Sequence, residues 1–190
     1  MAKCTECGST MTKTTGDHVY RESGLDNVIL RNIAKLECPK CGAKSVEIPQ
    51  MAKLHNAIAA ALAEKPARLE PPEVRFLRDH LELSNVQFAD LMGVSPAQSS
   101  RWTTTDAIGQ QAERLLRMLA VLGPDRVKPT GGLTINEDAV GVARAGLAEE
   151  TLDEMMKVIK QLPSVSDEVK PMKLGMRKSG TGWKSDAMTN

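Results

Sequence analysis

Two short cysteine motifs constrain the fold of this chain more than any other feature. One CxxC motif spans residues 4–7, the other spans 38–41, and a glycine follows each. Each motif lets two thiolates reach one ion, and the glycine permits the tight bend that directs backbone N–H groups toward sulfur. Two such motifs close a tetrahedral shell and leave no ligand position for water. The sequence therefore predicts a structural Zn²⁺ site with four ligands: Cys4, Cys7, Cys38 and Cys41.

Three alternatives to this zinc site exist. A single CxxC motif is also typical of thioredoxin-like redox pairs, but no βαβ pattern surrounds either motif here. His18 is a candidate substitute ligand, although four thiolates already fill the shell, and an ordinary strand position is the simpler interpretation. Iron has the same ligand preferences, so the sequence leaves the choice between zinc and iron open.

The composition of the chain indicates in which cellular compartment the protein is expected and how it could bind nucleic acid. No apolar leader opens the chain and no run of about 18 apolar residues occurs, so neither a secretory signal nor a membrane span is expected. Four cysteines in a chain without a leader favour a reducing, cytoplasmic location. The formal net charge is +1. Binding to nucleic acid would therefore depend on a local patch and not on bulk positive charge.

The fold class expected is α+β, with β and α structure in separate parts of the chain. Residues 1–65 predict a small zinc-binding, β-rich domain with one helix. Three prolines over 66–72 predict a linker. Residues 73–128 predict an all-α helix-turn-helix domain. Residues 129–162 predict a helical extension, and 163–190 predict a disordered tail.

Local patterns place the elements of the first domain. β-branched residues predict strands over 17–22 and 28–37, and polar–apolar alternation predicts a short one over 45–48. An Ala-rich run over 51–63 has the spacing of an amphipathic helix. Its apolar face is expected to contain Leu54, Ile58, Ala61 and Leu62.

The second domain contains two consecutive helix-start signals. Ser84 and Gln87 match a capping box, and so do Ser95 and Gln98. Gly93 stops the first of the two helices, so only a three-residue turn joins them. Two capped helices joined by such a turn are typical of a helix-turn-helix.

The second helix, over about 96–102, is the expected recognition helix, with its first turns facing base edges. Arg101 has the geometry to bind guanine bidentately and Gln98 to pair with adenine. Arginines at 75, 78, 114 and 117 favour DNA over a helical bundle that binds only protein. The DNA-contacting residues predicted are Ser95, Ala97, Gln98 and Arg101.

The order of these parts resembles the MqsA (YgiT-type) antitoxin family over about residues 1–128. The likeness consists of the cysteine spacing, the Pro-rich linker, the Leu83-Ser84 helix start and the Ser100-Arg101-Trp102 helix end. The helix-turn-helix alone is similar to the broad Xre class. What the resemblance implies is a homodimer that represses its own operon at a palindromic operator in double-stranded DNA. It also implies that the zinc domain neutralises a ribonuclease toxin.

The chain departs from this family in two places. Ala97 stands where the family has an asparagine that contacts a base, so a different operator is expected; an alanine can touch only a thymine methyl. Residues 129–190 extend beyond the short family members, and their helical stripe (Leu152, Met155, Met156, Ile159 and Leu162) is expected to pack on the chain itself or a dimer mate.

Two further functional classes are alternatives to an antitoxin. A stand-alone Xre-type transcriptional regulator, with the zinc domain as scaffold or effector sensor, is the alternative to an antitoxin. An enzyme is not expected, because the three histidines lie in separate elements and no nucleophile motif accompanies them. No catalytic residue and no cofactor besides structural zinc are predicted.

Overall fold

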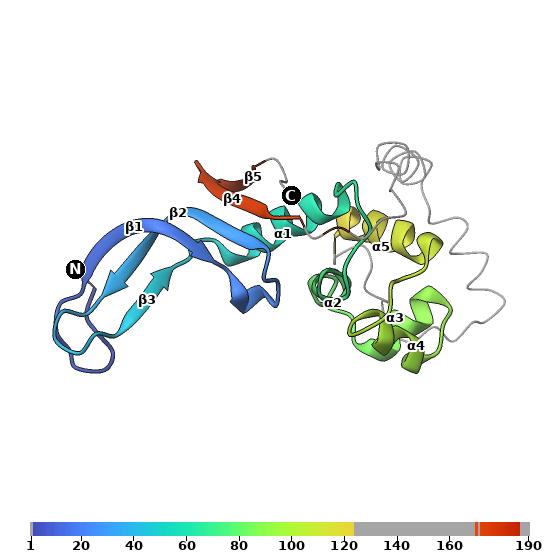
Figure 1. The fold of residues 1–190 in the computed structure, drawn as a ribbon, viewed down its shortest axis with the longest axis horizontal. Helices are drawn as coiled ribbons and strands as arrows, with labels where there is room; N and C mark the ends of the chain where they lie inside the picture. The colour runs from blue at the N-terminus through green and yellow to red at the C-terminus, as the bar shows by residue number, and fades with distance from the viewer. Residues whose placement is uncertain (1, 124–169, 171, 187–190) are drawn as a thin grey trace, which may run out of the picture. The chain divides into compact units, whose positions relative to one another are not determined.

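The computed structural model describes residues 2–123, 170 and 172–186 (Figure 1). These residues form a mixed α+β structure with one five-stranded sheet and five α-helices. None of the helices in this part of the chain has the length and apolar character needed to cross a membrane.

The chain divides into two compact units. Residues 1–61 and 171–190 form the first, which we call the sheet unit, and residues 62–170 form the second, the helical unit. The predicted helical extension over 129–162 lies outside the described residues.

The sheet is built around one long strand, β2 (Val28–Glu37). On one edge of β2, β1 (Thr12–Val19) pairs with it antiparallel. On the other edge, β3 (Lys44–Glu47) pairs antiparallel with the second half of β2 only. Val28 and Leu30 in β2 are fully buried and form part of the core of the sheet unit.

The first strand differs from its prediction over 17–22. β1 begins at Thr12 and ends at Val19, and residues Arg21–Ser23 form a single 3-10 turn, η1, which Gly24 ends at φ 78°. The reason is the length of β2: its pairing with β1 continues from Val19 as far as Thr12. The strands predicted over 28–37 and 45–48 are confirmed, the second within one residue.

A bulge interrupts the β1–β2 ladder between Gly16 and His18. Opposite it, Asn32 has φ 54°, in the left-handed region. The Asp17 carboxylate accepts a hydrogen bond from Arg31 Nη1 at 2.5 Å and one from the Asn32 N–H at 3.1 Å. Both bonds lower the pKa of Asp17, that from Arg31 most. Asp17 therefore satisfies the backbone N–H that the bulge removes from the ladder.

The predicted disordered tail over 163–190 is wrong for residues 172–186. There the chain forms a β-hairpin of β4 (Leu174–Ser179) and β5 (Gly182–Ser185), and β4 pairs parallel with the first half of β2. Gly180, at φ 57°, permits the two-residue turn. Leu174 and Met176 are almost completely buried. Their contacts with the rest of the sheet unit therefore give a fixed structure to a segment whose composition alone predicts disorder.

The helix predicted over 51–63 is confirmed as α1 (Met51–Ala63). All four residues of its predicted apolar face are buried. The side chain of Tyr20, itself buried, hydrogen bonds at 2.9 Å with Met51 Sδ and with His55 Nε2. α1 is thereby fixed to the chain segment that follows β1.

The helical unit contains four helices in its described part. They are α2 (Pro71–His80), α3 (Asn85–Met92), α4 (Pro96–Trp102) and α5 (Gln110–Leu122). α3 packs against α4, and α2 packs against both α4 and α5. Phe88, Ile108 and Leu116 are completely buried between them.

The predicted linker over 66–72 is in fact packed structure. Pro71 and Pro72 occupy the first turn of α2, where a missing N–H has no cost. Before them, the fully buried Arg117 guanidinium donates hydrogen bonds to the carbonyls of Ala63, Lys65 and Ala67 at 2.5–3.0 Å. A buried arginine thus satisfies three carbonyl groups that a flexible linker would expose to water.

Candidate functional site

The two CxxC motifs adopt the same backbone turn. In the first, the Cys4 N–H donates to the carbonyl of Ser9 at 2.8 Å, and the Gly8 N–H donates to the Cys4 carbonyl at 2.9 Å. The second repeats both bonds, with Cys38 and Gly42 in the equivalent places. The two glycines have φ 71° and 73°, which explains why glycine follows each motif.

These turns bring all four predicted cysteine ligands together. The Sγ atoms of Cys4 and Cys41 are 3.5 Å apart, those of Cys7 and Cys38 are 3.4 Å apart, and all four lie within 4.8 Å of one another. A tetrahedral ion with Zn–S bonds of about 2.3 Å requires sulfur–sulfur separations of about 3.8 Å. The cluster therefore has the size that one metal ion needs, and its donors are consistent with zinc.

The electrostatics of the cluster favour a cation at its centre. The Ser9 hydroxyl, followed by the Ser9 backbone N–H, lowers the pKa of the Cys7 thiol to about 6. The Ala43 N–H acts in the same direction on Cys41, but hydrogen bonds with the other three cysteines and burial raise the pKa of Cys41 to about 12. One thiolate thus opposes ionisation of its neighbours. A divalent ion removes this opposition by ligating all four sulfurs.

His18 lies apart from the cysteine cluster. It is in β1, and its Nε2 is 3.4 Å from a carboxylate oxygen of Glu22. Among the described residues, the cysteines alone form a group of three or more ligands that could hold a metal ion. The interpretation of His18 as an ordinary strand residue agrees with this position.

The two helices predicted as a helix-turn-helix are α3 and α4, and Gly93-Val94-Ser95 joins them. Ser84 Oγ accepts the Gln87 N–H at 3.3 Å, and Gln87 Oε1 accepts the Ser84 N–H at 2.9 Å, so the first capping box is complete. Gly93 ends α3 at φ 66°.

The second predicted capping box is only half formed. Ser95 Oγ accepts the Gln98 N–H at 3.2 Å, as expected for an N-cap. The Gln98 side chain does not return to the cap; its Oε1 accepts a hydrogen bond from Arg101 Nη2 instead. The competing cation one turn along the helix explains the difference, because an arginine donor binds a carbonyl oxygen more strongly than a neutral N–H does.

A polar contact that the sequence reading missed joins α3 to α4. Ser99 Oγ, which is fully buried, donates to Asn85 Oδ1 at 2.7 Å, and Asn85 Nδ2 donates to the Pro96 carbonyl at 2.9 Å. Asn85 directly follows the Ser84 cap, which was the one local sign of a special role. The pair fixes the N-terminus of α4 against that of α3.

α4 exposes one face at helical spacing and buries the other. Ser99 and Trp102 point into the unit. Arg101 on the outer face is about half exposed and lies 3.2 Å from Asp106. Of the predicted DNA-contacting residues, Ser95, Ala97 and Arg101 are exposed and Gln98 is partly exposed. The other exposed residues of α4 are Pro96 and Ser100, and Thr104 is exposed in the turn that follows the helix.

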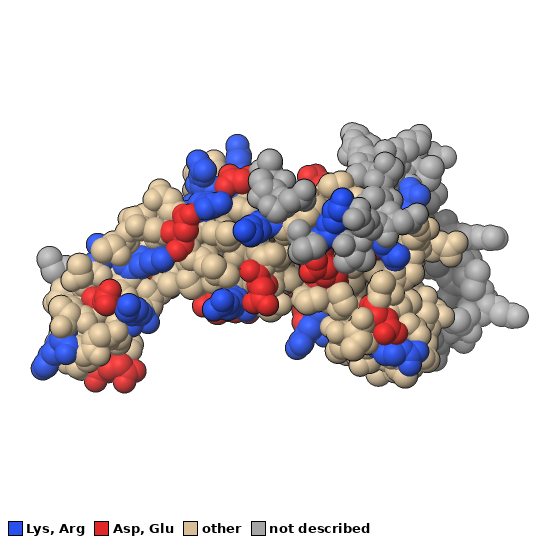
Figure 2. Space-filling view, viewed as in Figure 1, with Lys and Arg blue, Asp and Glu red and all other residues tan. Residues whose placement is uncertain are grey.

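The other arginines do not all reach the surface. Arg117 is completely buried, and its Nη2 lies 2.7 Å from Glu113 Oε1, so it is not available to a ligand outside the unit. Arg78 is paired with Asp79 at 2.5 Å, whereas Arg114 is exposed. Figure 2 shows basic and acidic side chains close together on the face in view, in keeping with the net charge of +1.

Comparisons of this chain with models of known protein families, with curated proteins and with solved structures find no match. Functional inference therefore depends on the geometry of the cysteine cluster and of α3 and α4.

Proposed function

We propose that this chain is a DNA-binding transcriptional regulator that contains one structural zinc ion. The observation that carries the proposal is the outer face of α4. It presents Ala97, Ser100 and Arg101, spaced so that they share one side of a rigidly seated helix, and the exposed Thr104 follows in the turn after it. A short exposed helix with polar and small residues, attached by a tight turn to a supporting helix, is what the DNA major groove admits.

Arg101 is the proposed base reader. In the free protein it is held by Gln98 and Asp106, so these contacts keep the guanidinium ordered at the last turn of α4. Binding to guanine requires release of the Asp106 carboxylate, which would otherwise repel DNA phosphate. Gln98 then has a free amide for a neighbouring adenine.

Two copies of the chain are proposed to act together. A single seven-residue helix such as α4 contacts only a few base pairs. A homodimer places two such helices about one DNA turn apart, at a palindromic operator. If the operator overlaps the promoter, binding of the dimer represses transcription. The four free cysteines agree with a reducing, cytoplasmic location.

The zinc site is proposed to be structural. Four sulfurs surround the centre, Cys4 and Cys38 are buried, and no position for a reacting water remains. The ion would stabilise the fold by joining the chain before β1 to the turn between β2 and β3.

The resemblance to MqsA-type antitoxins supports a second role for the sheet unit, namely neutralisation of a ribonuclease toxin. The alternative is a stand-alone Xre-type regulator. A pull-down of the tagged chain at native expression level separates them. A toxic protein recovered at equal stoichiometry, and silenced by this chain, supports the antitoxin; recovery only with itself and DNA supports the stand-alone regulator.

Selection from random duplex DNA with the full chain tests the core proposal. We expect a palindromic sequence to be enriched, and Arg101→Ala to lose preference at one base pair of each half-site by about 1–3 kcal/mol. Arg21→Ala removes an equal charge from the sheet unit and serves as the matched control. Failure to enrich any sequence, or equal effects of the two variants, would overturn the proposal.

A further inference from the structure

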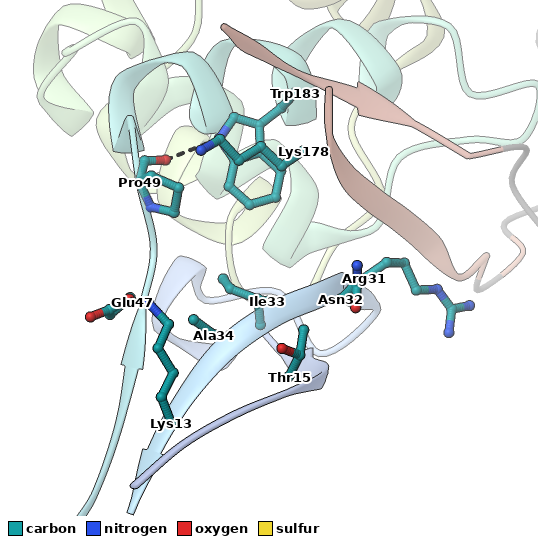
Figure 3. A pocket seen from close by; sticks show the side chains of 10 residues that line it. All are labelled: Lys13, Thr15, Arg31, Asn32, Ile33, Ala34, Glu47, Pro49, Lys178 and Trp183. Carbon is teal, nitrogen blue, oxygen red and sulfur yellow. Dashed lines mark hydrogen bonds and ion pairs between the residues drawn. The ribbon is translucent and has the colours of Figure 1, made fainter. Parts of the chain in front are cut away.

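A hollow of about 360 Å³ lies in the sheet unit, at the edge of β2 where two strands fail to meet (Figure 3). On this edge the pairing of β3 with β2 stops at Ala34, and that of β4 stops at Arg31. Asn32 and Ile33 between them have no partner strand on this side. The hollow is therefore a notch produced by the sheet topology, of the size typical of small-molecule sites.

Four apolar residues form one part of the notch, and polar or charged residues form the rest. The floor contains Ile33 and Ala34, and Pro49 lies at the side. Trp183 of β5 closes one end: its indole Nε1 donates to the Pro49 carbonyl at 3.1 Å, and the ring is largely buried (Figure 3). An indole fixed in this way offers a ligand a rigid apolar contact through the small part of the ring that is exposed.

The notch is lined by more cationic than anionic side chains. Three cationic side chains line it, but only one carboxylate, that of Glu47. Lys13 pairs with Glu47 at 2.6 Å, and Arg31 pairs with Asp17 at 2.5 Å. For Lys178, by contrast, the structure gives no hydrogen bond or ion pair with any other described residue. One ammonium group therefore remains for a ligand with a single negative charge.

We infer that this notch binds a small monoanionic carboxylate with a flat, apolar body. The carboxylate pairs with Lys178, and the body lies against Trp183, Ile33 and Ala34. An apolar pocket with one convergent charged group is the usual form of such sites. The inference goes beyond DNA binding, and its test uses no DNA, so the two proposals fail independently.

The notch also couples ligand binding to the C-terminal hairpin. Lys178 and Trp183 both come from the β4–β5 hairpin, and they are cross-strand partners within it. The floor, in contrast, belongs to β2, which lies far away in the sequence. A ligand bound to both parts must stabilise docking of the hairpin, because it binds the docked state only. If the chain is a regulator, this site is where a metabolite acts on it.

The first test is binding of 4-fluorobenzoate to the full, zinc-loaded chain, followed by fluorine NMR. The neutral 4-fluorobenzamide has nearly the same shape and is the matched ligand control. We expect the carboxylate to bind and the amide to bind at least about ten-fold more weakly, as loss of one charged hydrogen bond predicts. No binding of the carboxylate, or equal binding of both compounds, would overturn the inference.

Matched lysine variants locate the site. Lys178→Gln is expected to weaken 4-fluorobenzoate binding about ten-fold. Lys184→Gln removes the same charge from the same hairpin, at an exposed residue outside the notch, and should change affinity less than two-fold. Equal weakening by both variants would show general charge attraction and refute the site.

Hydrogen exchange tests the coupling between ligand binding and docking of the β4–β5 hairpin, and it also shows whether each variant is folded. Amides over 174–185 should exchange more slowly when 4-fluorobenzoate is present, while those of α3 and α4 should not change. Trp183→Phe keeps an aromatic ring but loses the bond to Pro49, so it should fold and bind more weakly. Binding without added protection of the hairpin would contradict the coupling.

Discussion

Ser99 Oγ of α4 lies 2.7 Å from Oδ1 of Asn85 in α3, and the donor hydroxyl is completely buried. This bond, with that from Asn85 to the Pro96 carbonyl, fixes the angle between the two helices. Asn85→Ala should lower the free energy of unfolding by about 1–3 kcal/mol, because the buried Ser99 hydroxyl loses its acceptor at 2.7 Å. Denaturant unfolding measures this. Ser100→Ala, at the exposed neighbouring position, is the control and should have little effect.

The buried ion pair of Lys65 and Glu73 gives a second prediction. Nζ and Oε2 are 2.7 Å apart and neither side chain is reached by solvent. Burial raises the pKa of Glu73 and the Lys65 ammonium opposes that rise. Lys65→Met removes the compensation and should destabilise the protein by about 3–5 kcal/mol. Lys65→Met with Glu73→Gln should recover much of this loss; a double variant as unstable as the single one would show that the charge was not the cause.

Zinc content and zinc removal give a third prediction. Protein purified under reducing conditions should hold one zinc per chain, and Cys38→Ser should hold less because Cys38 is a buried ligand. Chelation should unfold the region around the cluster, since a structural zinc of this type contributes roughly 10 kcal/mol or more. Elemental analysis and calorimetry measure both effects. Stoichiometric iron, with its visible absorption, would contradict the choice of zinc.

Stability should decrease in mild acid because of His55. Burial lowers the pKa of this imidazole below 6.5, so the unfolded chain binds a proton more readily than the folded one. The associated stability is complete above pH 6.5 and is lost as pH falls below it. Proton NMR should show His55 titrating below 6.5. Thermal unfolding of His55→Gln should decline less between pH 7 and 5.5 than that of the parent, with zinc content checked at each pH.

The features that sequence predicted well are those fixed by neighbouring residues. The turn of each CxxC motif, the Ser84–Gln87 capping box and the stop at Gly93 depend on spacings of at most a few residues. Their backbone geometry follows from local rules, so position in the fold hardly changes it. The helix over 51–63 was equally readable, because its apolar face repeats over three turns.

The features that sequence missed depend on distant partners. Arg117 looks like a surface charge, but it is buried because three carbonyls of the segment before α2 need donors. Met176 and Trp183 lie in a basic, Gly- and Ser-containing segment that by itself predicts disorder. They are ordered because β4 reaches an edge of β2 whose residues are far away in the chain. No local pattern carries that information.

Parallel pairing of β4 with β2 also has a consequence for synthesis of the protein. Asn27 Nδ2 donates to the Met172 carbonyl at 2.8 Å, across 145 residues of sequence. At about 5–20 residues per second, a ribosome needs roughly 7–30 s to make the intervening chain. During that time the first half of β2 has an open edge, which is a template for strands of other nascent chains. Slower translation should therefore increase aggregation, and a hairpin peptide of residues 172–186 supplied in trans should reduce it.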